Sequence, residues 1–332
     1  MKRILIIGGS AAGVSCAQTI RVKDSESQIT IVTKEAQAGY ARYRLAEFLA
    51  GEITAAQLSF RDEGFFKSKN IELVLNQEIE RIDIKKKQAV AKAGEDPGRM
   101  KFDYDILVLA TGASNALPDL KGINKNGVFG FREIAEVKDI LEIIPVCDTA
   151  CVMGNGIPAI KAANAFKRRG LEVKLISAAP PLGGLLDAES SEALKKHLLE
   201  KGIEIIADKV NEILGNGDVK AVRLENKKVL ACQIAVVAMG TSPNVKLIRE
   251  VPIACQNGVV VNEFQRTNIE DIYACGDVCA GSRGLWPDAL EQGRVAGENI
   301  CGNQTAFVVP SSDVTLDIFG LNLNLVKEPQ HV

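Results

Sequence analysis

The first thirteen residues, MKRILIIGGSAAG, decide the fold of this chain. Residues 2–7 form a short apolar run, typical of a strand buried on both faces of a parallel sheet. We expect a glycine-rich turn over 8–13 to follow, then a helix from Ala12 to about Lys23 and a strand over 29–32. In such a unit the turn lets the backbone approach a pyrophosphate, and the helix N-terminus supplies N–H groups.

The glycine turn of this first unit departs from the usual pattern at one position. Gly8 and Gly13 occupy the outer glycine positions, whereas Ser10 stands in the middle one, where a small residue is tolerated. An acidic residue is expected roughly 20 residues further on to bind a ribose, and Glu35 is the candidate. Taken alone, the pattern also fits a structural glycine turn in another α/β fold.

A second copy of the same unit begins near residue 150. A strand over 150–153 leads into the turn Gly154-Asn155-Gly156, which ends at Ala159, and a helix over 160–169 and a strand over 173–176 follow. This internal repeat is far more informative than either copy alone. The second copy ends in Ser177, so it has neither the acid typical of NAD sites nor a following arginine typical of NADP sites. Since neither signal is present, we lean to NAD, and NADP stays open.

Composition excludes several other classes of protein. The length of 332 residues predicts about two domains. A net charge of -2 argues against a broad basic face for nucleic acid, and no apolar run reaches the ~18 residues of a membrane span. The chain has two histidines and no Cys-x-x-Cys, which excludes a multi-histidine metal site and the common cysteine motifs. The first apolar run is too short for a signal peptide, so we expect a cytoplasmic protein.

Three further segments complete an ordered set of motifs. A buried strand over 104–112 ends in ATG, its counterpart over 234–244 ends in AMGTSPN, and residues 273–278 read YACGDV. Together with GGSAAG and GNGIPA, this set resembles the flavoproteins of the pyridine nucleotide–disulfide oxidoreductase superfamily, from Met1 to about Gly302. The resemblance implies an α/β fold of two Rossmann-like, three-layer ββα domains, in which the NAD(P) domain is inserted into the FAD domain.

The resemblance also implies domain boundaries and site residues. It places the FAD domain at 1–115 and 243–305, the NAD(P) domain at 116–242, and the start of a shortened interface domain or a tail at 306–332. A helix beginning near Asp288 would direct its N-terminus at the flavin, where it stabilises negative charge. The residues expected at FAD are Gly8, Gly9, Ser10, Ala11, Ala12, Gly13, Glu35, Arg42, Ile79, Thr111, Gly112, Gly276 and Asp277. Those expected at NAD(H) or NADP(H) are Gly154, Gly156, Ala159, Ser177 and Gly240.

The segment GYARYRLAE at residues 39–47 indicates the branch of the superfamily. Disulfide reductases carry a cysteine pair here, and related NADH oxidases carry one cysteine at the position of Tyr43. A phenol cannot replace a thiolate nucleophile. The Tyr-x-Arg-x-x-Leu pattern instead resembles rubredoxin reductases and the flavin domains of nitrite reductases. We therefore expect electrons to pass from NAD(P)H through FAD to a rubredoxin- or ferredoxin-like protein, or to partner redox subunits.

Two charges are reversed relative to many members of the superfamily. Those members have a lysine at the position of Glu47 and a glutamate at the position of Lys161. We predict that Glu47 and Lys161 approach each other beside the isoalloxazine as a swapped, catalytically relevant ion pair. The alternative is that both are ordinary surface charges.

Two other functions stay open at this point. An electron-relay subunit of a larger complex would fit the short C-terminal region and the missing acid at Ser177. An NADH oxidase or disulfide reductase acting on a small acceptor would need a reactive cysteine or an open flavin face. Tyr40 and Tyr43 either shield the flavin or simply pack.

Overall fold

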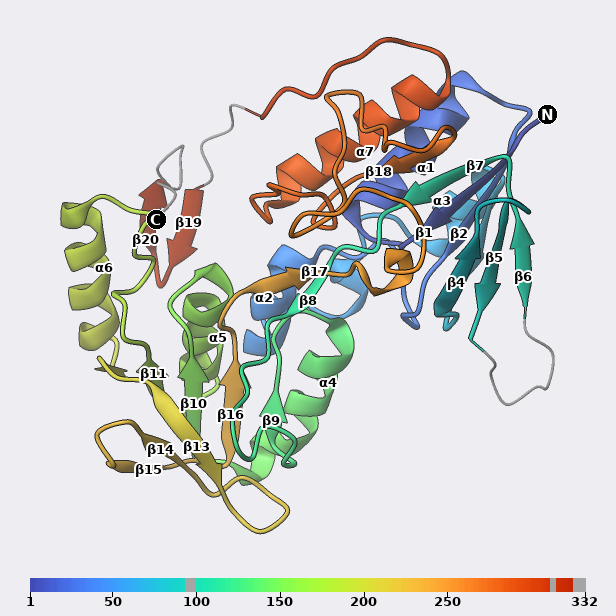
Figure 1. Cartoon of the computed structure of the whole chain (residues 1–332). Helices are drawn as coiled ribbons and strands as arrows, with labels where there is room; N and C mark the ends of the chain where they lie inside the picture. The colour runs from blue at the N-terminus through green and yellow to red at the C-terminus, as the bar shows by residue number, and fades with distance from the viewer. Residues whose placement is uncertain (93–99, 311–314, 325–332) are drawn as a thin grey trace. The chain divides into compact units, whose positions relative to one another are not determined.

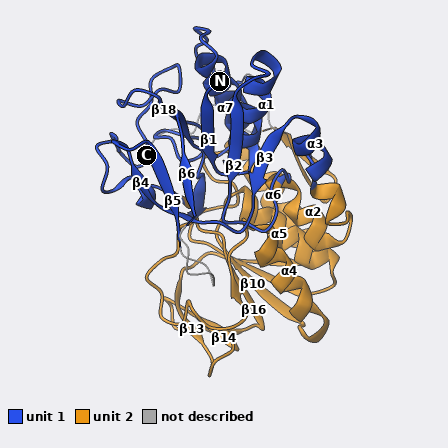
Figure 2. Cartoon of the chain, turned by 90° about the vertical axis from the view of Figure 1, so that its right-hand side faces the viewer, with its two compact units in different colours: residues 1–41, 59–114, 242–311 blue, residues 42–58, 115–241, 312–332 orange. Residues whose placement is uncertain are grey.

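The chain divides into two compact units, coloured separately in Figure 2. The computed structural model describes residues 1–92, 100–310 and 315–324. Unit 1 comprises Met1–Ala41, Ser59–Ser114 and Ser242–Ser311, and unit 2 comprises Arg42–Leu58, Asn115–Thr241 and Ser312–Val332. The segment 42–58, which lies early in the chain, therefore groups with the later unit.

Unit 1 is built on a parallel sheet of five strands (Figure 1). Its order is β3-β2-β1-β7-β18, with β1 at the centre. The strands are β1 (Arg3–Ile7), β2 (Gln28–Val32), β3 (Ile71–Val74), β7 (Ile106–Leu109) and β18 (Ile272–Ala274). An antiparallel sheet consists of β4 (Ile79–Asp83), β5 (Gln88–Ala91) and β6 (Lys101–Asp103), and the helices are α1 (Ala11–Lys23), α3 (Glu63–Ser68) and α7 (Trp286–Ile300).

Side chains of β1 alternate between two hydrophobic cores, which defines three layers. Ile4 and Ile6 pack in the core that contains residues of α1 and α7. Leu5 and Ile7 pack in the other core, with residues of β4 and β5. Because successive strand residues point to opposite faces, one buried run fills both cores. The central sheet therefore lies between a helical layer and an antiparallel β layer, as the ββα expectation requires.

Unit 2 repeats this architecture. Its parallel sheet has the order β12-β11-β10-β16-β9. The strands are β9 (Val128–Phe129), β10 (Thr149–Met153), β11 (Glu172–Ile176), β12 (Ile203–Ile206) and β16 (Ile234–Val237). A second antiparallel sheet has β13 (Val210–Leu214), β14 (Ala221–Leu224) and β15 (Val229–Ala231), and the helices are α2 (Leu45–Ala50), α4 (Ile134–Ile143), α5 (Ile157–Arg168) and α6 (Ala188–Glu200).

The remaining elements are short. The chain passes between the units through β8 (Ala113–Asn115) and β17 (Thr241–Pro243), which pair with each other. A hairpin of β19 (Thr315–Ile318) and β20 (Leu321–Asn324) contacts α5 and α6 of unit 2. Single 3₁₀ turns lie at Arg42–Arg44, Ala56–Leu58, Ile144–Val146 and Lys246–Ile248.

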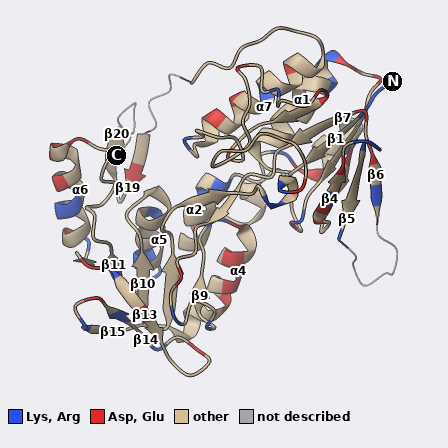
Figure 3. Cartoon of the chain, in the orientation of Figure 1, with Lys and Arg blue, Asp and Glu red and all other residues tan. Residues whose placement is uncertain are grey.

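Two observations concern the surface of the described residues. Along α6 two glutamates are followed by two lysines and a further glutamate, and Figure 3 shows both signs of charge on this helix. Over residues 1–92, 100–310 and 315–324, no helix combines the length and apolar character that a membrane span requires.

The helix α7 begins two residues before Asp288, near which it was expected. It starts at Trp286, with Pro287 in its first turn. Proline is favoured there because its missing N–H would have no helical partner anyway and its φ suits a helix.

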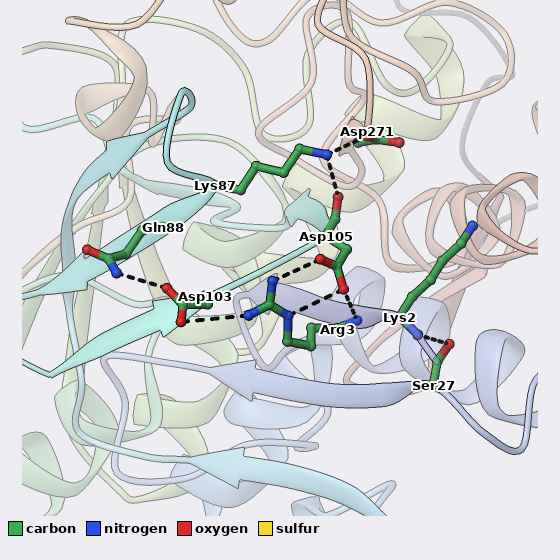
Figure 4. A network of polar contacts seen from close by, with 8 residues as sticks. All are labelled: Lys2, Arg3, Ser27, Lys87, Gln88, Asp103, Asp105 and Asp271. Atoms are coloured by element: carbon green, nitrogen blue, oxygen red, sulfur yellow. Dashed lines mark hydrogen bonds and ion pairs between the residues drawn. The ribbon is translucent and has the colours of Figure 1, made fainter.

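A polar network connects the start of β1 to β6 and to the turn before β18 (Figure 4). Asp105 accepts from the Arg3 backbone N–H at 2.7 Å and from its guanidinium at 2.9 Å. Lys87 donates to the Asp105 carbonyl and pairs with Asp271 at 2.7 Å. The Arg3 guanidinium and backbone N–H together lower the pKa of Asp105 to about 2.

We predict that Asp105→Asn destabilises the protein at neutral pH. The Asp105 side chain is 40% exposed, so the ion pair contributes less than about 1 kcal/mol. Because the folded-state pKa lies below the ordinary 3.8, this stabilisation is present above about pH 4 and is lost as the pH falls toward 2. Urea unfolding at several pH values checks it.

The matched control is Asp103→Asn, since Asp103 lies 3.6 Å from Arg3 and is more exposed. The loss of unfolding free energy in Asp103→Asn should be smaller than that in Asp105→Asn. An effect of Asp105→Asn that stays constant between pH 7 and pH 2 would contradict the assignment.

Candidate functional site

The turn from β1 into α1 is formed by a very close backbone approach at Gly8. Its φ is +122°, a conformation that side chains rarely tolerate. A Cβ added to Gly8 would lie 2.0 Å from the Ala110 carbonyl oxygen at the end of β7. The Gly8 N–H donates to Val32 O at the end of β2. Gly8 therefore brings the carboxyl ends of three strands together.

The following residues give the start of α1 a geometry suited to an anion. Gly13 lies against Gly8, because a Cβ on Gly13 would be 2.0 Å from the Gly8 carbonyl oxygen. Ser10 is the extended N-cap residue, and the first helical bond runs from Val14 N–H to Ser10 O. The N–H groups of the first turn have no partner within the helix and favour negative charge. Gly9, Ala11 and Ala12 complete this turn.

Helix α7 lies side by side with α1 and extends beyond its start (Figure 1). A Cβ on Gly293 would be 2.1 Å from the Ala12 carbonyl oxygen, and one on Gly297 would be 2.9 Å from Cys16 O. A step toward the C-terminus of α7 moves the contact toward the C-terminus of α1, so the two helices run parallel. Helix α7 therefore begins about two turns, on the order of 9 Å, before the level at which it comes alongside the start of α1.

Gly276 and Asp277 lie directly against the glycine turn that leads into α1. A Cβ on Gly276 would be 2.8 Å from the Ala12 Cβ, and the Gly276 N–H donates to the buried Gln292 Oε1 at 2.7 Å. At the start of α7, the buried Asp288 carboxylate binds Arg283 through two hydrogen bonds of 2.6 and 2.5 Å. The predicted Gly-Asp motif and the two helix starts therefore share one edge of the sheet.

Thr111 and Gly112 are held by Asn244, for which the sequence analysis gave no role. Asn244 Nδ2 donates to Thr111 O at 2.8 Å, and the Asn244 N–H donates to Gly112 O at 2.9 Å. Ser114 Oγ donates to Asn244 Oδ1. Asn244 stands at the end of the AMGTSPN motif, so the signal was its place in that motif.

Glu35 lies in the loop that follows β2. Its carboxylate accepts a hydrogen bond of 2.5 Å from the Tyr40 hydroxyl, and its carbonyl accepts from the Asn76 N–H. Ile79 is the first residue of β4 and is buried in the β-layer core. The loop and the glycine turn meet where the Gly39 N–H donates to Gly9 O.

In unit 2 the same geometry recurs at the start of α5. Gly154 has φ +134°, its N–H donates to Ile176 O, and a Cβ on it would lie 2.1 Å from Ala238 O. A Cβ on Gly156 would meet nothing closer than Pro158 Cδ at 3.8 Å, so this position is open. Ala159 packs behind Gly154, and Gly240 has φ +104° in open space. Ser177 Oγ accepts from the Ala179 N–H.

Lys161, Glu47 and Arg42 lie together in unit 2, where α2 packs against α5. Lys161 Nζ donates to the Tyr43 carbonyl at 3.1 Å, and the Glu47 carboxylate pairs with Arg44 at 2.7 Å. Arg42 donates to the Arg132 carbonyl. Burial lowers the pKa of Lys161, and the Glu47 charge opposes that shift. Glu47 therefore acts on Lys161 at longer range, with Arg44 as its direct partner.

Three buried cysteines of unit 1, Cys16, Cys275 and Cys279, are poor candidates for a redox centre. Burial raises the pKa of Cys16 and Cys279 well above the ordinary value and that of Cys275 to about 12. A thiol of this kind is a weak nucleophile at neutral pH. The segment from Thr33 to Leu58 contains no cysteine.

Comparison with known proteins finds a family and several relatives. The family model described as "Pyridine nucleotide-disulphide oxidoreductase" matches residues 2–293. The chain is 31% identical to an NADH oxidase of Methanocaldococcus jannaschii over 92% of its own length and 71% of that protein. It is 30% identical to a rubredoxin-NAD(+) reductase of Pseudomonas putida, covering 92% of this chain and 82% of that one.

Solved structures give the same picture. A NAD-dependent persulfide reductase from A. fulgidus superposes with a TM-score of 0.90 at 29% identity, covering 96% of this chain and 62% of that one. The NADH:rubredoxin oxidoreductase of Clostridium acetobutylicum gives a TM-score of 0.80 at 26% identity, covering 97% and 83%. The chain is thus shorter than each of these proteins.

We predict that Glu47→Gln lowers the pKa of Lys161 further. The carboxylate is the charge that most favours the protonated lysine against burial, so its removal increases the neutral fraction at any given pH. NMR titration of the reductively ¹³C-methylated lysine checks this.

Glu52→Gln is the matched control, because Glu52 pairs directly with Arg168 and acts on Lys161 more weakly. A pKa of Lys161 that falls more in the Glu52 variant than in the Glu47 variant would show the assignment to be wrong.

Proposed function

Because the chain belongs to the pyridine nucleotide-disulphide oxidoreductase family, we propose that it passes electrons from NAD(P)H through FAD to a one-electron protein carrier. FAD and NAD(P)H are the cofactors of this family. The two glycine turns, each closed so tightly that an added Cβ would collide with backbone, fit two dinucleotides. When bound, FAD supplies the chemistry of accepting a hydride and releasing single electrons.

In this proposal unit 1 holds FAD. The turn Gly8–Gly13 and the start of α1 receive the pyrophosphate, and Glu35 binds the adenosine ribose. Asp277 binds the ribityl chain, next to Gly276, Thr111 and Gly112. The start of α7 lies beyond that of α1 along the same direction, so its N–H groups stabilise negative charge on the reduced ring. Ile79, the buried first residue of β4, lies near the adenine.

Unit 2 holds NAD(P)H in the same proposal. Gly154, Gly156 and Ala159 form the turn that accepts the pyrophosphate, with Gly240 at the end of the adjacent strand. The loop after β11 reads Ser177-Ala178-Ala179 and offers no charged side chain to the ribose. The loop therefore carries no charge that selects between NADH and NADPH, and either nucleotide is a candidate donor. Lys161 and Glu47, on α5 and α2, set the charge next to the reacting rings.

The single observation that favours a protein carrier over a disulfide substrate is the cysteine pattern. No cysteine lies between Thr33 and Leu58, and the buried thiols of unit 1 have raised pKa values. The rubredoxin reductases among the relatives act with a protein of this kind. We infer a rubredoxin- or ferredoxin-like acceptor.

The proposal is tested by anaerobic addition of NADH, then NADPH, to the FAD-loaded protein. Both should bleach the yellow absorbance, and oxidised rubredoxin or ferredoxin should restore it faster than oxygen or coenzyme A disulfide does. The proposed protein acceptor would be contradicted if the bleached protein were not reoxidised by either rubredoxin or ferredoxin but turned over a disulfide rapidly. If neither nucleotide bleached the protein, the proposed NAD(P)H oxidoreductase activity would be contradicted.

We predict that Gly156→Ala raises KM for NADH and NADPH without lowering the thermal midpoint. The added methyl meets open space in the fold but stands where the backbone approaches the pyrophosphate. We expect at least a tenfold effect, or about 1.4 kcal/mol. Steady-state kinetics and calorimetry measure the two quantities.

The matched control is Gly154→Ala, which should lower the thermal midpoint because its methyl collides with Ala238 O at positive φ. An unchanged KM in a folded Gly156→Ala protein would remove NAD(P)H from this turn.

A further inference from the structure

A buried tyrosine is bonded to the carboxylate proposed to bind the FAD ribose. The Tyr40 side chain is 2% exposed, and its hydroxyl donates to Glu35 Oε2 at 2.5 Å. This is the length of a charge-assisted O–H···O⁻ bond, which is roughly twice as strong as a neutral one. The sequence alone is compatible with Tyr40 shielding the flavin or packing, and this bond is a third role.

The loop that carries both residues is fixed by its backbone. The Thr33 N–H donates to Val74 O, the Glu35 N–H to Thr33 Oγ1, and the Gly39 N–H to Gly9 O. The last bond joins the loop to the glycine turn itself. The loop therefore has a defined position beside the proposed pyrophosphate site without any contribution from the Tyr40–Glu35 bond.

The internal repeat shows what this loop needs in order to fold. In unit 2 the Ser177 N–H donates to Ile206 O, the Ala179 N–H to Ser177 Oγ, and the Leu182 N–H to Asn155 O. These three bonds correspond one by one to those of unit 1. Ala179 stands where unit 1 has Glu35, and Gly183 follows where unit 1 has Tyr40. A loop one residue shorter, with the same three anchoring bonds, thus forms without a Tyr–Glu pair.

We propose that Tyr40 is a positioning residue that orients the Glu35 carboxylate toward the adenosine ribose of FAD. The inference rests on the proposed function, since it requires FAD in unit 1. Because the pair is dispensable for the loop fold, its place next to the glycine turn indicates a ligand-directed role. A carboxylate accepts up to about four hydrogen bonds, so the bond from Tyr40 leaves capacity for the ribose hydroxyls.

Orientation by Tyr40 has a specific energetic consequence. A glutamate side chain in a loop loses rotamer freedom when it binds a ligand, and a fixed carboxylate has already lost it. Tyr40 acts through Glu35 and does not itself touch the nucleotide. Its removal should therefore affect FAD, which contains the adenosine ribose, and should leave FMN, which lacks it, unaffected.

The test is a double-mutant cycle on FAD affinity with Tyr40→Phe, Glu35→Gln and the double variant. Equilibrium dialysis with FAD and with FMN gives Kd for each. We expect Tyr40→Phe to weaken FAD binding about tenfold, as for a lost hydrogen bond to a charged group. Glu35→Gln should weaken it at least as much, the double variant should be no weaker than Glu35→Gln, and Kd for FMN should not change.

Tyr104→Phe is the matched control. Tyr104 is also buried in unit 1, but its hydroxyl has no hydrogen-bond partner among the described residues, so FAD affinity should be unchanged. Additive losses in the double variant, equal weakening of FMN, or no effect of Tyr40→Phe would overturn the inference. The thermal midpoint of the apoprotein separates misfolding from lost affinity. A wild-type chain that binds no FAD would instead overturn the proposed function.

Discussion

The structure of each unit depends on one contact, where the chain leaves the central strand and turns into a helix. At Gly8 and at Gly154 the backbone passes so close to the end of the neighbouring strand that a methyl group would lie about 2 Å from a carbonyl oxygen. Only glycine permits this approach at positive φ. The turn brings the helix start to the carboxyl edge of the sheet, where nucleotides bind in open α/β sheets. The dinucleotide proposals for both units rest on this geometry.

Duplication of that unit gives the protein two similar sites that differ in detail. The two parallel sheets share the order of four strands and the hydrogen bonds around the turn, and each unit carries an antiparallel β layer. Unit 1 adds α7, whose glycines allow it to lie against α1 and extend past it, and a loop with Glu35 and Tyr40. Over its described residues, unit 2 has neither feature at the matching places. In the proposed function these two additions belong to the FAD site of unit 1.

Much of the fold followed from short-range pattern. Buried strands, glycine turns and the repeat predicted the two-domain α/β class because strand burial and turn geometry are local properties of the sequence. The sequence could not show that residues 42–58 group with unit 2. Their packing against α5 depends on tertiary contacts, such as that of Lys161 with the Tyr43 carbonyl. Likewise, Arg44 as the direct partner of Glu47 and Tyr40 as the partner of Glu35 depend on side-chain directions in loops, which have no periodic signal.

The central claim is that unit 1 is a flavin site built on the Gly8 turn, and bound cofactor measures it most directly. After incubation with FAD and gel filtration, the protein's absorbance spectrum and the nucleotide released on denaturation give identity and stoichiometry. The account predicts one FAD per chain, and a Gly8→Ala protein that retains none. A wild-type chain that elutes colourless, or one that retains FAD equally well with alanine at position 8, would contradict it.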